Sequence, residues 1–216
     1  MILLLTLMFI SYLAGSTPTS IIVARVAKGI DIREHGSGNA GGTNVFRVMG
    51  AKYAVFVAAV DIFKGWFGAA IIASWTLGGY LGELPFSNPI LVAILCGTCA
   101  VLGHTYTIFA GFHGGKGVGT LAGMLIYLFP VAVAVGLSVW VVVLILSGYV
   151  GLSSVTAVSL FPLITYLQYG SLNSTLGYFS IIIPLFIWFT HRSNISRLLA
   201  GTENRFEKAR LFHRKK

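Results

Sequence analysis

Long apolar stretches, separated by short polar or turn-forming breaks, follow one another along most of the chain. Helices of about 20 apolar residues cross a bilayer, and shorter ones are tolerated. The fold class expected is therefore an all-α integral membrane protein, a seven-transmembrane-helix bundle. The approximate bounds of the seven predicted spans are 2–27, 53–75, 89–107, 118–129, 131–146, 153–167 and 178–189.

The number of crossings has a second solution. No Asp, Glu, Lys or Arg occurs from Gly117 to Thr190, so only turn-forming residues divide this part of the chain into four segments. The first of them, 118–129, is too short to cross alone, and a bundle of five spans is the alternative to seven. Both solutions place the polar loops 28–52 and 103–117 on the same side as the basic C-terminal tail, because an even number of crossings separates them.

The start of the chain predicts the orientation. Met1 to Ala24 has no basic residue, and the first one, Arg25, follows the apolar stretch, which is the reverse of a secretory signal peptide. The segment is therefore expected to be a retained first span that is kinked or ended at Pro18. Basic residues favour the cytoplasmic side, so the N-terminus is expected outside and the C-terminus in the cytoplasm.

Two glycine-rich stretches interrupt the apolar pattern. The first reads Gly36-Ser37-Gly38-Asn39-Ala40-Gly41-Gly42-Thr43-Asn44-Val45-Phe46-Arg47 and has neither a helical nor a strand period, so a loop is predicted there. Glycine brings backbone N–H groups close to a ligand, and the polar side chains and the arginine add groups that bind anions. The second, Gly114-Gly115-Lys116-Gly117, repeats the combination with a lysine. Both are predicted to be anion-binding loops, and for the second a flexible turn whose lysine extends to the membrane surface is the alternative.

Composition supports a membrane protein and excludes several classes of function. Of 216 residues, 56% are hydrophobic and 10% are charged, against about 25% charged in soluble domains. The formal net charge of +9 lies largely beside apolar stretches, with eight Lys and Arg residues after His191. This placement suits anionic lipid rather than nucleic acid. Cys96 and Cys99 lie within an apolar stretch, no acidic cluster suits a divalent metal, and neither a metal nor a cofactor is expected.

Charged and titratable residues at the edges of the predicted spans are the remaining candidates. Asp61 and Lys64 are three residues apart and share a helix face; they are either a structural ion pair or a pair from which Lys64 reaches a bound phosphate. His104 borders the second glycine-rich stretch, as a structural hydrogen-bonding group or as a chemical one. His191 and Asn194 share a helix face at the membrane boundary.

Three segments resemble the motifs of the bacterial acyl-phosphate:glycerol-3-phosphate acyltransferases. Gly36–Arg47 resembles the first motif, GSGN-x-G-x-TN-x-x-R; residues 103–120 resemble the second, and residues 191–203 the third. The resemblance covers essentially the whole chain. It departs at Thr107, where the family has proline, and at Gly148-Tyr149-Val150-Gly151, where the family often has Arg-Tyr-x-Ser, although Ser154 remains available.

The resemblance implies a single membrane-embedded domain over residues 1–216, in a bacterial inner membrane, with the motifs converging on a cytoplasmic-side site. It implies transfer of a fatty acyl group from acyl phosphate to the 1-hydroxyl of glycerol 3-phosphate, giving lysophosphatidic acid and phosphate. The partners expected are these small molecules and membrane lipid, with no nucleic acid, and the chain is expected to be a monomer. A small membrane anion transporter is the alternative function.

Roles follow for the matching residues. His191 is the candidate base, with the substrate's own phosphate as the alternative, and Asn194 is a candidate oxyanion donor. Ser37 is either a hydrogen-bond donor or a covalent nucleophile, and direct acyl transfer is preferred. Lys116 is expected to hold the phosphate of glycerol 3-phosphate, and Arg47 the other phosphate. The further substrate-binding candidates are Gly36, Gly38, Asn39, Thr43, Asn44, Lys64, His104, Gly114, Gly115, Gly117, Ser154, Arg192 and Arg197.

Overall fold

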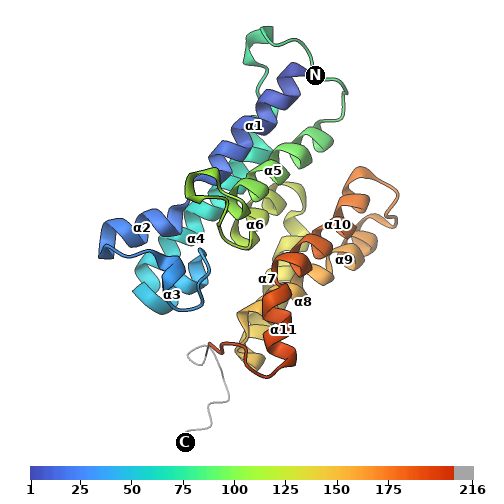
Figure 1. The fold of residues 1–216 in the computed structure, drawn as a ribbon. Coiled ribbons are helices and arrows are strands. Elements are labelled where there is room, and N and C mark those ends of the chain that lie inside the picture. Colours follow the sequence, from blue (N-terminus) through green and yellow to red (C-terminus); the bar gives the residue numbers. More distant parts are fainter. Residues whose placement is uncertain (207–216) are drawn as a thin grey trace, which may run out of the picture. The chain divides into compact units, whose positions relative to one another are not determined.

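The structure, a computed structural model, describes residues 1–206, and the predicted basic tail beyond them lies outside the described residues. Within this part of the chain the regular structure is helical and no strand is present (Figure 1). The chain divides into two compact units, Met1–Leu128 and Phe129–Lys216. The expectation of a single domain stays a prediction beside this division, and each unit is described here by itself.

The first unit contains six α-helices joined by short helical turns. Small residues let its long helices approach closely. A Cβ at Gly65 would overlap the carbonyl oxygen of Thr120, and a Cβ at Gly123 would overlap that of Ile62, so glycines on both partners bring α4 and α6 together. The helices are α1 (Ile2–Ser16), α2 (Thr19–Lys28), α3 (Gly42–Met49), α4 (Ala51–Trp66), α5 (Pro89–Thr105) and α6 (Val118–Leu128).

Five helical turns complete the first unit. They extend α4, connect it with α5, and shape the two loops that carry the glycine-rich stretches. They are η1 (Ile32–Glu34), η2 (Phe67–Ile71, a π-helical turn), η3 (Ile72–Ser74), η4 (Leu77–Gly79) and η5 (Ile108–Ala110).

The described part of the second unit, residues 129–206, contains five α-helices. Phe129, Phe161 and Phe179 form an aromatic core, with ring centroids 6.0 Å apart for Phe129 and Phe161 and 6.4 Å apart for Phe129 and Phe179. Gly148 adopts φ 77° and ends α7 with the left-handed conformation that glycine tolerates. The helices are α7 (Pro130–Ser147), α8 (Val150–Ser159), α9 (Phe161–Tyr169), α10 (Thr175–Thr190) and α11 (Arg192–Leu199).

The seven predicted spans all coincide with helical segments, which confirms the all-α membrane fold class. By length and composition, five segments of the described chain are able to cross a membrane, and two apolar helices, Val118–Leu128 and Thr175–Thr190, are shorter. The break predicted at Pro18 is present, because α1 ends at Ser16 and α2 begins at Thr19. The five long segments are Ile2–Lys28, Ala51–Ser74, Pro89–Ala110, Pro130–Ser147 and Val150–Tyr169.

The loop predicted over residues 36–47 is wrong for its second half. Gly42 to Met49 form α3, which buries Asn44, Val45 and Met49. The helical period of α3 could not be recognised in the sequence, because the stretch begins with glycines and its apolar side chains recur only from Val45 onward. Packing of this short helix against its neighbours stabilises it, as expected for a helix too short to form alone.

Candidate active site

Ser37 lies on an exposed loop that Asn44 holds from the inside. Asn44 is buried in α3, and its Oδ1 accepts a hydrogen bond from the Ser37 backbone N–H at 2.8 Å. Its Nδ2 donates to the carbonyl oxygens of Ile32 at 3.0 Å and His35 at 2.9 Å. Gly36 has φ 62°, and a Cβ there would overlap Asn44 Oδ1. The loop is therefore fixed beneath an exposed Ser37.

Asn44 itself does not fit the substrate-binding role predicted for it. Both of its amide hydrogens are given to backbone carbonyls, and its oxygen accepts from Ser37. A side-chain amide has two donor hydrogens, so none is left for a ligand. Asn44 is thus a positioning residue, whereas Asn39 and Thr43 are half-buried around the start of α3 and stay predicted contacts. Gly38 has φ 72°, a left-handed conformation that strongly favours glycine at this turn after Ser37.

A buried charge cluster lies between α4 and α5. Lys64 Nζ is 2.8 Å from Asp61 Oδ1, and both side chains are only 6% exposed. His104 Nδ1 is 3.5 Å from the same carboxylate oxygen and 3.4 Å from Lys64 Nζ. Lys64 also donates to the carbonyl oxygen of Thr17 at 2.9 Å, where the helix break at Pro18 exposes that group.

This cluster favours the structural interpretation of Asp61 and Lys64. An ammonium group has three N–H donors, and Asp61, Thr17 and His104 lie within reach of Lys64 as three partners. Asp61 and Thr17 engage Lys64 in this arrangement, and its predicted contact with a substrate phosphate stays a prediction. Paired burial also explains how charges persist within a span.

The second glycine-rich stretch folds back onto the end of α5. The backbone N–H of Gly115 donates to the His104 carbonyl at 3.1 Å, and that of Gly114 donates to the Thr105 carbonyl at 3.0 Å. A Cβ at Gly115 would overlap His104 Nε2, so only glycine fits against the ring. These two amides are occupied, and the anion nest expected from them is not formed here. Their observed role is close packing beneath the loop.

The two glycine-rich stretches meet around His104. A cavity of about 10 Å³ has Ala40 of the first stretch and Gly114 and Gly115 of the second in its wall, together with Asp61 and His104. Its polar lining and size suit about one water molecule. The two glycine-rich stretches, about 75 residues apart in the sequence, therefore line the same small buried cavity.

Arg47 and Lys116 stay the predicted phosphate ligands of the first unit. Arg47 lies in the last turn of α3, and Lys116 lies between Gly115 and Gly117; both side chains are half-buried. Gly117 has φ 81° and directly precedes α6. The positive φ lets the backbone turn sharply from Lys116 into the helix.

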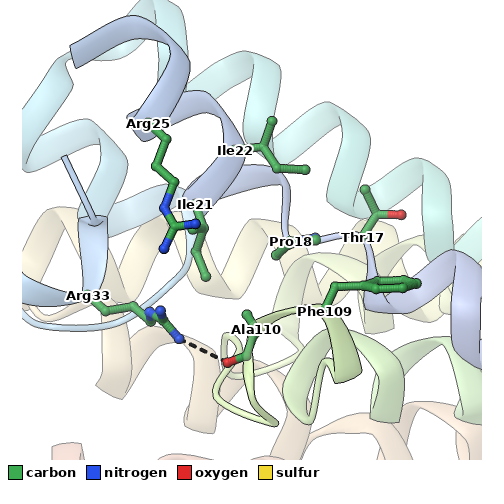
Figure 2. Close-up of a pocket in the computed structure, with 8 residues that line it drawn as sticks. All are labelled: Thr17, Pro18, Ile21, Ile22, Arg25, Arg33, Phe109 and Ala110. Atoms are coloured by element: carbon green, nitrogen blue, oxygen red, sulfur yellow. Dashed lines mark hydrogen bonds between the residues drawn. The ribbon is translucent and has the colours of Figure 1, made fainter. Parts of the chain in front are cut away.

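Arg33 joins the loops that carry the two glycine-rich stretches, a role that the sequence did not indicate. Its Nη1 donates to the carbonyl oxygens of Ala110 at 3.0 Å and His113 at 3.4 Å, and Figure 2 shows the bond to Ala110. Its Nη2 lies 2.7 Å from Asp31 Oδ2, which also pairs with Arg25 at 3.2 Å. Hydrogen bonds from Arg33 hold the pKa of Asp31 well below its usual range, and the carboxylate raises the pKa of Arg33 in turn.

In the second unit, His191 sits where α10 ends and α11 begins. Its Nδ1 is 3.0 Å from the carbonyl oxygen of Ile187, and the residue is buried. A carbonyl only accepts, so this contact assigns the proton to Nδ1 and leaves the lone pair of the neutral ring on Nε2. That tautomer is the one a general base at Nε2 requires.

Asn194 is fixed by the carboxylate of Glu203, the last residue of the segment that resembles the third motif. Asn194 Nδ2 donates to Glu203 Oε1 at 2.7 Å, and Arg197 Nε donates to Glu203 Oε2 at the same distance. The Glu203 side chain is only 4% exposed. Gly151 leaves the room for Asn194, since a Cβ there would lie 2.9 Å from Nδ2. Glu203 thus binds two predicted site residues together.

Two further candidates of this unit are engaged elsewhere. Ser154 is 3% exposed, and its hydroxyl donates to the Val150 carbonyl at 3.0 Å and accepts from Trp140 Nε1 at 3.2 Å. Both contacts are within the protein, and the substrate-binding role of Ser154 stays a prediction. Arg192 donates to the carbonyl of Phe189 at 2.9 Å and stacks over its ring at 4.5 Å, yet it is exposed and stays a predicted contact.

Comparison with known proteins decides the family. A sequence profile described as "Glycerol-3-phosphate acyltransferase" matches residues 5–201. The chain belongs to the glycerol-3-phosphate acyltransferase family. The glycerol-3-phosphate acyltransferase of Chlorobaculum parvum is 42% identical over 95% of this chain and 97% of that relative. The one of Chlorobium phaeobacteroides strain DSM 266 is 40% identical over 96% and 98%.

Solved relatives agree. The crystal structure of PlsY, an integral membrane glycerol 3-phosphate acyltransferase, in its glycerol 3-phosphate form has a TM-score of 0.78 and 35% sequence identity, covering 94% of this chain and 95% of that one. The lysophosphatidic acid form of PlsY has a TM-score of 0.76. The family inferred from the three motifs is confirmed. This chain is accordingly a membrane acyltransferase of phospholipid biosynthesis, and the transporter alternative gains no support.

Proposed function

We propose that this enzyme takes its acyl group from acyl phosphate and attaches it to the 1-hydroxyl of glycerol 3-phosphate. The products are lysophosphatidic acid and inorganic phosphate. The observation that carries the proposal is the match to PlsY, at 35% identity over 94% of this chain, in a glycerol 3-phosphate form and a lysophosphatidic acid form. These two molecules are the acceptor and the product of the proposed reaction.

The reaction is a direct acyl transfer. The hydroxyl oxygen of glycerol 3-phosphate attacks the carbonyl carbon and forms the ester bond, while the anhydride C–O bond to phosphate breaks and phosphate leaves with the bonding electrons. The hydroxyl proton passes to Nε2 of His191. The contact between His191 Nδ1 and the Ile187 carbonyl supports this role, because it leaves the lone pair on Nε2.

The other roles follow from charge and exposure. Acyl phosphate is already an activated donor, so alignment and stabilisation of the oxyanion are the main tasks left for the protein. Ser37, exposed on a loop that Asn44 fixes, donates a hydrogen bond in the transition state. Arg47 and Lys116 bind the two phosphate groups, with Lys116 on glycerol 3-phosphate. Charge-assisted contacts of this kind suit phosphate oxygens.

The acyl donor is tested by offering purified enzyme glycerol 3-phosphate with acyl phosphate, acyl-CoA or acyl carrier protein carrying the same chain. Lysophosphatidic acid and an equal amount of phosphate are expected from acyl phosphate alone. Turnover with acyl-CoA or acyl carrier protein, but not with acyl phosphate, would overturn the donor assignment while leaving family membership intact. Positional analysis of the product checks that the acyl group is on the 1-oxygen.

We also propose that the enzyme lies in the bacterial inner membrane with its N-terminus outside and its C-terminus in the cytoplasm. The loop between η3 and α5 has Glu83 as its one charged residue, whereas the segment from Lys28 to Lys52 and the chain after α10 carry more basic than acidic residues. In a variant without Cys96 and Cys99, an impermeant thiol reagent is expected to label Ser87→Cys from outside and Ser196→Cys only after lysis. The reverse labelling would invert the orientation.

A monomer is proposed as well, and light scattering in detergent tests it.

A further inference from the structure

A second cavity, distinct from the small buried cavity around His104, opens beside α2. It has a volume of about 330 Å³ and lies where α2, the loop after it and the turn η5 meet (Figure 2). Arg25 and Arg33 line one part of it, and Ile22, Pro18 and Phe109 line the rest. The cavity therefore combines a cationic end with apolar walls, a combination that suits an amphiphilic anion.

At the cationic end of the cavity, two arginines pair with one aspartate. Asp31 is the acidic partner of both arginines, at 2.7 Å from Arg33 and 3.2 Å from Arg25. Two guanidinium groups therefore share one carboxylate at ion-pair distance, and the exposed Glu34 acts on Arg33 from farther away. The Arg25 side chain is 62% exposed, so its remaining donors face the opening. Guanidinium donors bind phosphate oxygens in pairs.

The apolar walls continue the surface of a membrane span. Ile22 belongs to the long apolar segment Ile2–Lys28 and is 46% exposed, and Phe109 in η5 is 62% exposed. Arg25 and Lys28 follow on the same segment. Exposed apolar and aromatic side chains next to basic ones are typical of the boundary between the acyl chains and the headgroups of a bilayer.

The size of the cavity limits its occupant. Pockets for small ligands run from about 300 to 1,000 Å³, so about 330 Å³ holds a headgroup and the first carbons of a chain but not a whole lipid. We propose that the cavity binds the phosphate headgroup of an anionic phospholipid from the surrounding bilayer. Arg25 holds the phosphate, and the one N–H of Arg33 that is not engaged by Asp31, Ala110 or His113 adds a single contact. Ile22 and Phe109 cover the start of an acyl chain.

The site is separate from the predicted acyl-transfer residues but is joined to them through Arg33. Arg33 uses Nη1 on the carbonyl oxygens of Ala110 and His113, which precede the second glycine-rich stretch. A bound lipid would thus share a side chain with the contact between the two glycine-rich loops. The inference goes beyond the proposed reaction and holds whichever acyl donor the enzyme uses.

The experiment measures lipid binding to delipidated enzyme by native mass spectrometry. Phosphatidylglycerol and phosphatidylcholine with the same acyl chains are the probes. We expect the wild-type enzyme to prefer phosphatidylglycerol, and Arg25→Gln to weaken its binding about five- to tenfold, as for the loss of one hydrogen bond to a charged group at a partly exposed site. Arg25→Lys is expected to keep most of the preference. Lys52→Gln, which removes an equally exposed cation outside the cavity, is the matched control and should bind as wild type does.

Three results would overturn the proposal. The first is equal binding of both lipids by the wild-type enzyme, and the second is an equal loss in Arg25→Gln and Lys52→Gln. The third is displacement of phosphatidylglycerol from the Arg25-dependent site by inorganic phosphate or lysophosphatidic acid at the same concentration, which would make a free anion or the product its occupant. Acyl transfer by Arg25→Gln in phosphatidylcholine should stay within about twofold of wild type, since Arg25 is outside the proposed acyl-transfer residues. That readout separates a failure of this site from a failure of the proposed reaction.

Discussion

Asp61 and Asp31 each hold two basic side chains, yet in opposite surroundings. Asp61 and its partner Lys64 are 6% exposed inside the first unit. Asp31 is 14% exposed, and its partners Arg33 and Arg25 are 29% and 62% exposed. Buried charges depend strongly on each other, whereas exposed ion pairs contribute about 0–1 kcal/mol. The comparison indicates that the buried network holds helices together, whereas the network around Asp31 sets how the two loops with glycine-rich stretches meet.

The largest effect is expected from Asp61→Asn. The substitution keeps the shape of the side chain but leaves the Lys64 ammonium without its carboxylate, which costs about 3–5 kcal/mol for a buried pair. The measurement is thermal unfolding of the purified enzyme in detergent. Asp31→Asn is the matched control, because it makes the same chemical change in the loop network. Equal losses in the two variants would break the distinction drawn between the networks.

Two lysines sharpen the comparison next. Lys116→Met is expected to raise KM for glycerol 3-phosphate about 10- to 100-fold, as for the loss of charged hydrogen bonds to phosphate, with a smaller change in KM for the acyl donor. Lys64→Met is expected to lower stability while leaving KM close to wild type, because Lys64 Nζ pairs with Asp61 and donates to the Thr17 carbonyl. Steady-state kinetics on both variants decide the matter. A normal KM in Lys116→Met would refute its assignment to the phosphate.

Asn44, an uncharged buried side chain, is expected to give an effect of intermediate size. Asn44→Ala removes three hydrogen bonds from the loop under Ser37, and kcat is expected to fall about tenfold or more because Ser37 loses its fixed position. Asn173→Ala, at an exposed asparagine of the second unit, is the control and should change little.

Ser37→Ala should retain measurable turnover. An acyl group trapped on Ser37 by mass spectrometry would contradict direct transfer.

The smallest effect concerns pH and the loop network. The pKa of Asp31 is lowered by the Arg33 hydrogen bonds, so its contribution to stability is fully present above its ordinary value of 3.8 and is lost as the pH falls toward the lowered pKa. At pH 6, Asp31→Asn is expected to be about 1 kcal/mol less stable than wild type. The difference should shrink progressively below pH 3.8 in thermal unfolding. A difference that grows in acid would give the opposite sign and contradict the role of Asp31.

The apolar pattern predicted the helices well, because bilayer thickness and proline govern where spans run and break. Breaks at Pro18 and before Pro130 lie where the sequence places them. Helix α3 was missed because the glycines before it hide a short apolar period that tertiary packing completes. The periodicity of a sequence reflects only local pattern, whereas a helix as short as α3 depends on packing against other segments of the fold.

The sequence indicated candidate site residues by their type but could not indicate their hydrogen-bond partners. His191 and Asn194 were selected from a shared helix face, and the structure adds the Ile187 carbonyl and Glu203 that fix them. Asn44 was taken for a ligand because a polar residue in a glycine-rich motif looks the same whether it faces outward or inward. Arg33 contacts backbone carbonyls 77 and 80 residues away. Carbonyl partners carry no side-chain signature, so sequence reasoning had no means to find them.

The break between α1 and α2 has a consequence for the order in which the protein is made. At this break the Thr17 carbonyl accepts from Lys64 of α4, and the Ser16 carbonyl accepts from the hydroxyl of Thr107, which follows α5. The first span therefore obtains its final hydrogen bonds only after two later spans have been synthesised. Until then its end must be hydrated or held by the insertion machinery, since an unpaired carbonyl is costly in lipid. The end of α1, although it is synthesised first, is thus expected to reach its final structure only after α4 and α5 have been inserted.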